Sequence, residues 1–194
     1  MTENDLRSLI QSWENIALLV RYIGDYPEHL DLIMTKVLDD SRPEYWRAAW
    51  MVDKIHERHP ELVAPYLQVM TDFVLTTQNA GKKRHLLKLI SLNDIQEENM
   101  ALLLNYCLEV FTNAAEPVAV RVHAMQILFN IAQKEPDFSG ELIELIENKI
   151  ELHGSAGLAS RGRKLLKKLK PHPQPFPKIG KGVWSVEILK ILII

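Results

Sequence analysis

The amino-acid sequence predicts an all-α protein whose helical hairpins stack into an α-α superhelix. Two observations lead to this fold class. In residues 1–170 the apolar side chains recur every three or four positions, never in clean alternation, and glycine and proline fall between the periodic segments. Arg47, Arg84 and Arg121 also lie 37 residues apart, each early in the first helix of a pair. A repeat of this length with two helices per unit is typical of solenoid proteins, whose neighbouring hairpins bury each other's apolar faces.

The chain divides into four predicted hairpins and a terminal helix. Pro27 and Pro117 suit the first position of a helix, where the missing N–H costs least. We expect Gly24 to end the first helix and Pro65 to begin a helix, since proline inside a helix would break it. The first pair covers residues 5–23 with 27–38, the second 43–58 with 65–75, and the third 82–92 with 96–111. The fourth pair lies within 116–150, on the two sides of a turn at 134–137, and a last helix covers 158–170.

The composition limits the class of protein. The 194 residues suffice for one domain with a substantial core, and the net charge of −2 gives no overall attraction to nucleic acid or to an anionic membrane. Cys107 is the single cysteine, which suits a reducing compartment. The N-terminal residues lack the pattern of a secretion signal, and no stretch has the roughly 20 apolar residues that a membrane span needs. We therefore expect a cytoplasmic protein.

One sequence pattern resembles a known repeat family. The pattern V-R-x-x-A-x-x-x-L, which begins at Val120 shortly after Pro117, resembles a HEAT repeat. The resemblance covers about residues 5–170. It implies an armadillo-like superhelix that binds other proteins.

Three longer stretches resemble a narrower group. RAAWMVDKI at 47–55, VAVRVHAMQILFNIA at 118–132 and RKLLKKL at 163–169 are similar to short bacterial HEAT-like proteins that often carry the label adenylosuccinate lyase. True lyases of that name are more than twice as long, and their catalytic serine lies on a loop of Ser-Ser-x-Met-Pro-x-Lys-x-Asn type. This chain contains no such stretch, so no lyase residue is carried over.

Two candidate chemical sites have simpler structural interpretations. His56 and His59 flank Glu57, but they are three positions apart, and the zinc protease motif needs four so that both rings face one metal. Both histidines fit the C-terminal end of a helix, whose dipole they complement. Cys107 lies on an apolar helix and fits a small buried side chain. We therefore expect no catalytic residue, no metal ligand and no cofactor.

Basic residues raise two further alternatives. Residues 161–170 hold six bases and no acid, which suits either phosphate contacts or pairing with the preceding helix. We favour pairing, because an antiparallel last helix would lie beside an acidic stripe. The stripe is formed by Glu141, Glu144, Glu147 and Glu151. For Arg47, Arg84 and Arg121 we favour bridges to acidic groups of neighbouring repeats over a ladder along a binding face.

The function that these patterns favour is a non-catalytic protein-interaction or scaffold module. The second helices of such stacks usually line the concave face, and their polar residues are the candidate contacts. These are Gln68, Thr71, Asp72, Glu98, Asn99, Asn105, Glu141 and Glu144. The acidic members indicate a basic peptide or protein as partner. The main alternative is a HEAT-like DNA-repair glycosylase, which is disfavoured because the basic charge is concentrated at one end of the chain. A genuine lyase is the least favoured function. The sequence leaves the oligomeric state open.

The last 24 residues differ from the rest of the chain. Pro171, Pro173, Pro175 and Pro177 alternate, which predicts an extended spacer, and the apolar KGVWSVEILKILII follows. The sequence thus predicts a repeat domain over 1–170 and a tail over 171–194 that is either a docking segment or disordered, non-native sequence. We favour the second interpretation of the tail.

Deletion of residues 171–194 is expected to leave the melting temperature of the protein nearly unchanged, because the repeats bury their apolar faces against each other. Thermal unfolding followed by circular dichroism at 222 nm measures this. A large fall in melting temperature would show that the tail is part of the folded domain.

Overall fold

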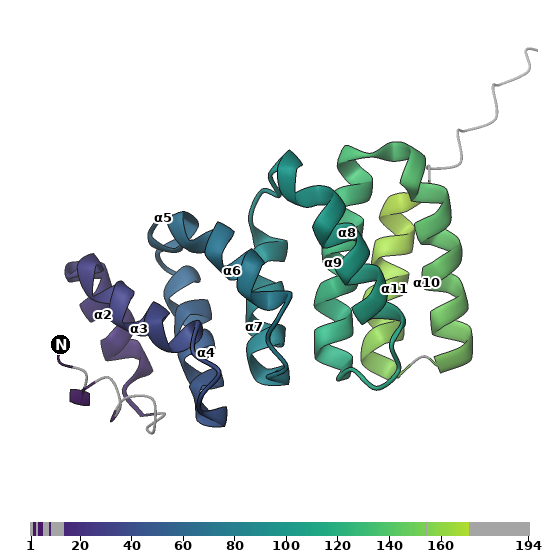
Figure 1. Cartoon of the computed structure of the whole chain (residues 1–194). Helices are drawn as coiled ribbons and strands as arrows, with labels where there is room; N and C mark the ends of the chain where they lie inside the picture. The colour runs from purple at the N-terminus through teal and green to yellow at the C-terminus, as the bar shows by residue number, and fades with distance from the viewer. Residues whose placement is uncertain (1, 3, 6–7, 9–13, 154, 171–194) are drawn as a thin grey trace, which may run out of the picture.

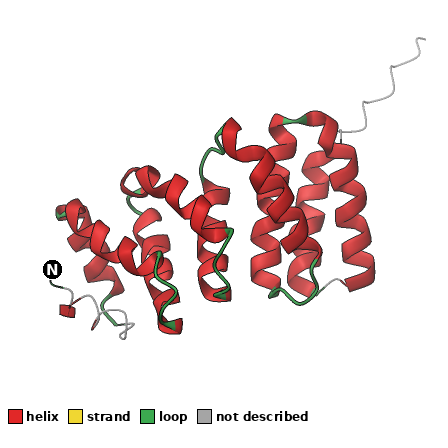
Figure 2. Ribbon diagram, in the orientation of Figure 1, coloured by secondary structure: helices red, strands yellow, loops and turns green. Residues whose placement is uncertain are grey.

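The computed structural model describes residues 2, 4–5, 8, 14–153 and 155–170, and within them the chain forms stacked helices (Figure 1). None of these residues belongs to a β-strand (Figure 2). The predicted all-α fold of helical hairpins is therefore confirmed.

The helices form two layers. The first helices of the hairpins pack against one another in chain order, and each second helix packs against the first helix of the next hairpin. The first helices are α2 (Ile16–Asp25), α4 (Trp46–His56), α7 (Ala80–Leu92), α9 (Val118–Lys134) and the terminal α11 (Ala156–Leu169). The second helices are α3 (Leu30–Val37), α6 (Leu67–Val74), α8 (Glu97–Thr112) and α10 (Ser139–His153).

Short helical turns begin several of these elements. Proline is the first or second residue of each turn, where its fixed φ is already helical and its missing N–H costs least. The turns are Pro27–His29, Pro43–Tyr45, Ala64–Tyr66 and Pro136–Phe138, and a four-residue helix α5 covers Pro60–Val63. The second helix of this hairpin was predicted to begin near Pro65, and α6 begins at Leu67. The helix α5 before it was not predicted, and Pro65 lies in the helical turn that joins α5 to α6.

Two predictions about the first helix were wrong. The helix is not continuous from 5 to 23, since Glu14 and Asn15 form a turn and α2 starts at Ile16. Gly24 does not end α2, which continues to Asp25. Gly24 instead admits the ring of His59, because a Cβ at this position would lie 2.7 Å from His59 Nε2. The small residue is needed for a contact between hairpins that local sequence does not show.

One continuous apolar core runs through the stack. Fully buried side chains come from every hairpin and from α11, so each repeat is closed by the next. Examples along the chain are Ile23, Val37, Ile55, Val74, Leu86, Phe111, Leu128, Leu142 and Leu158.

A buried polar cluster joins the second hairpin to the third. The Asp53 carboxylate, on α4, contacts His85 Nδ1 at 3.0 Å and Lys88 Nζ at 2.6 Å, both on α7. The ring of Trp46 stacks on His85, with centroids 6.3 Å apart. Burial raises the pKa of Asp53, but the bonds from His85 and Lys88 outweigh it and hold that pKa below its usual value.

The recurring arginines do not share one role. Arg121 is buried and its Nε donates a 3.0 Å hydrogen bond to the Phe111 carbonyl at the end of α8, not to an acidic side chain. Arg84, one period earlier, is exposed. The predicted bridge to an acid of the neighbouring repeat is therefore wrong for Arg121, which satisfies a helix-terminal carbonyl instead.

Asp53→Ala is expected to lower the free energy of unfolding by about 1–3 kcal/mol, because it leaves the buried His85 without its carboxylate partner, while Lys88 keeps its contact with Glu57 at 3.4 Å. The partly exposed ion pair of Lys54 and Glu57, 2.7 Å apart, provides a control. Lys54→Ala should lower the free energy of unfolding by no more than about 1 kcal/mol. Urea unfolding measures both.

The effect of Asp53 should also depend on pH. A carboxylate with a lowered pKa in the folded state stabilises the fold above its unfolded pKa, and this contribution is lost as the pH falls through the folded pKa. The difference in stability between the wild type and Asp53→Ala should therefore shrink below about pH 4. A difference that stays constant down to the acid transition would contradict this role.

Candidate functional site

A groove of about 420 Å³ separates the second helices of the second and third hairpins. Its walls come from the start of α6, from the loop between α7 and α8, and from the first two turns of α8. Four of the eight predicted contact residues line it: Gln68, Thr71, Glu98 and Asn99. The groove exists because α6 packs mainly on α7 and α8 packs mainly on α9. The two second helices meet each other less closely.

Paired amides cross the groove. Asn99 Nδ2 donates to Gln68 Oε1 at 2.7 Å, and Gln68 Nε2 donates to Asn99 Oδ1 at 3.3 Å. Gln68 Nε2 also lies 3.0 Å from a carboxylate oxygen of Asp72. These bonds fix the distance between α6 and α8 and hold Asp72 beside the groove.

The predicted contact residues divide into buried and exposed sets. Thr71 is buried, and its hydroxyl donates to the Leu67 carbonyl one turn earlier, while Asn99 is buried by its amide pair. The side chains of Asp72, Glu98 and Asn105 are exposed on α6 and α8. Glu141 and Glu144 are also exposed, but they lie on α10 and do not line the groove. The structure thus brings together only part of the predicted set.

The charge of the groove is negative. Its described lining includes Asp94 and Glu98 but no lysine or arginine. Asp94 pairs with Lys134 at 2.6 Å, whereas Glu98 forms no ion pair with a described residue. Glu97 and Glu98 occupy the first turn of α8, where carboxylates also complement the helix dipole. The free carboxylate of Glu98 remains available to a cation from outside.

Exposed apolar side chains accompany these acids. Val69 on α6 is 38% exposed and Leu102 on α8 is 46% exposed. Leu102 lies one turn after Glu98, so both belong to the outer side of α8. An apolar contact next to a carboxylate suits a partner segment that has both a basic and an apolar side chain.

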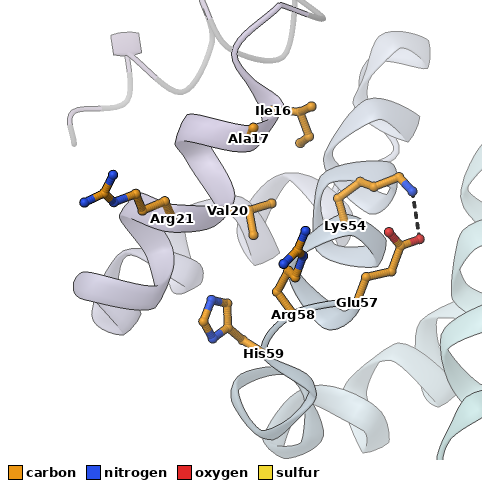
Figure 3. Close-up of a pocket in the computed structure, with 8 residues that line it drawn as sticks. All are labelled: Ile16, Ala17, Val20, Arg21, Lys54, Glu57, Arg58 and His59. Carbon is orange, nitrogen blue, oxygen red and sulfur yellow. Dashed lines mark hydrogen bonds and ion pairs between the residues drawn. The ribbon is translucent and has the colours of Figure 1, made fainter.

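A second hollow lies at the N-terminal end of the stack. It measures about 490 Å³ and opens between α2 and the end of α4, with Ile16, Ala17 and Val20 on one wall (Figure 3). Arg58 reaches toward Val20, and Lys54 pairs with Glu57 on the other side (Figure 3). The lining is cationic, because Glu57 is its one described carboxylate and Arg21, Lys54 and Arg58 are its cations.

The side chains considered for chemistry are engaged in the fold. His56 Nε2 lies 3.1 Å from the amide of Asn93, and His59 packs over Gly24. Burial raises the pKa of the Cys107 thiol, which disfavours its nucleophilic form. Asp53 and His85 form an acid–imidazole pair that the sequence did not reveal, but both are buried beyond the reach of a substrate. Among the described residues no three His, Cys, Asp or Glu side chains are grouped to hold a metal ion.

Comparison with known proteins establishes the family. A family model for the HEAT repeat domain matches residues 2–169. The chain belongs to the HEAT repeat family. Neither the curated proteins nor the solved structures gave a match to it, so the likeness to proteins labelled adenylosuccinate lyase stays a prediction. No helix of the described part of this HEAT repeat protein is long and apolar enough to cross a bilayer.

Asn99→Ala is expected to lower the free energy of unfolding by about 1–2 kcal/mol, because it removes a buried amide that bonds across two helices. Asn105→Ala, at an exposed position of α8, should change the free energy of unfolding by no more than about 0.5 kcal/mol. Urea unfolding of both variants separates structural from free members of the predicted set. Equal losses of stability in the two variants would contradict a structural role that Asn99 has and Asn105 lacks.

Proposed function

We propose that this HEAT repeat protein is a non-catalytic interaction module whose α6–α8 groove binds a basic segment of a protein partner. The observation that carries the proposal is the groove itself, an open hollow with carboxylates and without a described lysine or arginine in its lining. A stacked-helix scaffold suits such a role, because its grooves between repeats are rigid and their side chains vary without cost to the core.

Three features of the groove support a peptide-like partner. The paired amides of Gln68 and Asn99 link the two helices at a fixed distance, so the site is formed before binding and little ordering is needed. Glu98 supplies a charge that no described cation neutralises. Val69 and Leu102 supply exposed apolar surface nearby, and burial of that surface would add affinity.

The remaining predicted contacts extend this surface. Asp72 and Asn105 are exposed on α6 and α8, and Glu141 and Glu144 are exposed on α10. All four belong to the second-helix layer. A partner longer than the groove would meet further carboxylates in the direction of α10.

The proposal is tested by selecting binders from a random peptide display library on the wild-type protein, with counter-selection against Glu98→Lys. We expect the selected peptides to be enriched in lysine or arginine together with an apolar residue. Individual peptides should bind Glu98→Lys at least about tenfold more weakly, because a favourable charge contact becomes a repulsion. Fluorescence anisotropy with labelled peptides measures the affinities.

Glu151→Lys is the matched control, since it makes the same charge change at an exposed position near the far end of α10. It should alter peptide affinity by no more than about twofold, because exposed charges farther apart than the Debye length are screened. Peptides without an excess of basic residues, or equal weakening by both variants, would contradict a specific acidic groove.

A further inference from the structure

The two helix layers carry opposite charge. Among the first helices, α11 holds five lysines or arginines, α7 four, α4 and α9 two each and α2 one, against one acid in α2 and one in α4. The second helices reverse this, with four acids in α10, three in α8 and one each in α3 and α6, against one lysine in α3 and one in α10. The small net charge of the chain therefore hides a basic face and an acidic face.

The basic face is strongest over α7, α9 and α11, which pack in that order and contain no acidic residue. Some of their cations are used inside the fold. Lys82 is buried and bonds the Asp40 carboxylate at 2.9 Å, and Lys83 pairs with Glu116. Lys134 is exposed but pairs with Asp94, and the other exposed cations of these helices are Arg84, Arg163, Lys164, Lys167 and Lys168.

The cations of α11 are not neutralised as expected. Of the predicted pairs with the acidic stripe of α10, the described residues form one, between Lys170 and Glu147 at 2.6 Å. Leu158, Gly162 and Leu165 form the buried side of α11, where Gly162 packs closely on Ile150 of α10. The basic residues Arg163, Lys164, Lys167 and Lys168 lie on the exposed remainder of the helix.

Cations from neighbouring helices converge near the middle of this face. His123 on α9 has a pKa lowered to about 4, first by burial and then by the positive charges of Lys88, Arg84 and Arg161. Arg84 belongs to α7 and Arg161 to α11, and both helices pack on α9, so cations from two helices lie on either side of α9. Packed helices lie about 8–10 Å apart, so this region spans about 20 Å.

We propose that the first-helix face binds the phosphate backbone of a nucleic acid, with α7, α9 and α11 at its centre. The contacts would be made by the guanidinium groups of Arg84, Arg161 and Arg163 and by the ammonium groups of α11. Guanidinium groups form paired hydrogen bonds with phosphate oxygens, and neutralised phosphates release counterions. The face continues toward the N-terminal hollow, where Arg58 and Arg21 form no ion pair with a described residue.

The character of the surface favours nucleic acid over an acidic protein. Protein interfaces draw most of their energy from apolar and aromatic anchors. Between the cations of this region, α9 presents the half-exposed polar residues Gln126 and Asn130. The large exposed apolar side chains described on these helices are Leu92 at the end of α7 and Val118 at the start of α9. A charged surface without central anchors suits contacts to a backbone, which need no apolar pocket.

The test uses fluorescence anisotropy of the full chain with fluorescein-labelled duplex DNA and duplex RNA of equal length at low salt. We expect binding to at least one duplex, with an affinity that falls steeply as salt rises. Arg84→Glu and Arg163→Glu should each weaken it about tenfold and reduce the salt dependence by about one counterion per lost phosphate contact. Both positions are exposed, and Arg84→Gln and Arg163→Gln provide milder versions that keep the fold.

Controls separate this surface from net charge and from the groove. Arg42→Glu, at an exposed residue before α4, should weaken duplex binding no more than about twofold. Glu98→Lys should not weaken it at all, because its groove lies on the other layer. The absence of binding to either duplex at low salt would overturn the proposal. Displacement of the duplex by polyglutamate at equal charge concentration would also overturn it, in favour of an acidic protein partner.

Discussion

Every hairpin in this protein has an apolar face that its own two helices leave uncovered, and the next hairpin must cover it. Each second helix accordingly packs on the first helix that follows it, and the first helices pack on one another. This arrangement encloses the first helices more than the second. It also keeps the second helices apart, and the groove between α6 and α8 is a direct consequence.

The same stacking requires polar groups to be placed between repeats. Asp53 joins α4 to α7 through His85 and Lys88, and Lys82 ties α7 to the loop after α3 through Asp40. Such buried groups persist because each has a partner within bonding distance. Residues that suggest catalysis in the sequence, the histidines and Cys107, are thus used to join or fill the stack.

Separation of charge by layer gives the molecule two different surfaces. The second helices present carboxylates with exposed Val69 and Leu102, and the first helices present arginine and lysine around the half-buried His123. Because the two surfaces lie on opposite layers, a basic peptide and a nucleic acid would not compete for the same residues. A scaffold that holds two kinds of partner needs this separation.

The sequence by itself determined the all-α class, the hairpin repeat and most helix boundaries, because apolar periodicity and proline positions are local signals. It also placed Gln68, Glu98 and Asn99 on second helices, and the structure brings these residues together in one groove. It could not show that Thr71 is buried, that Gly24 makes room for His59, or that Asp53 meets His85. The contacts of Gly24 with His59 and of Asp53 with His85 join residues more than 30 positions apart, and only tertiary packing sets their distance. The charge of α11 shows the same limit. Sequence suggested that its bases pair with α10, whereas among the described residues one such pair forms, between Lys170 and Glu147, and Arg163, Lys164, Lys167 and Lys168 are exposed.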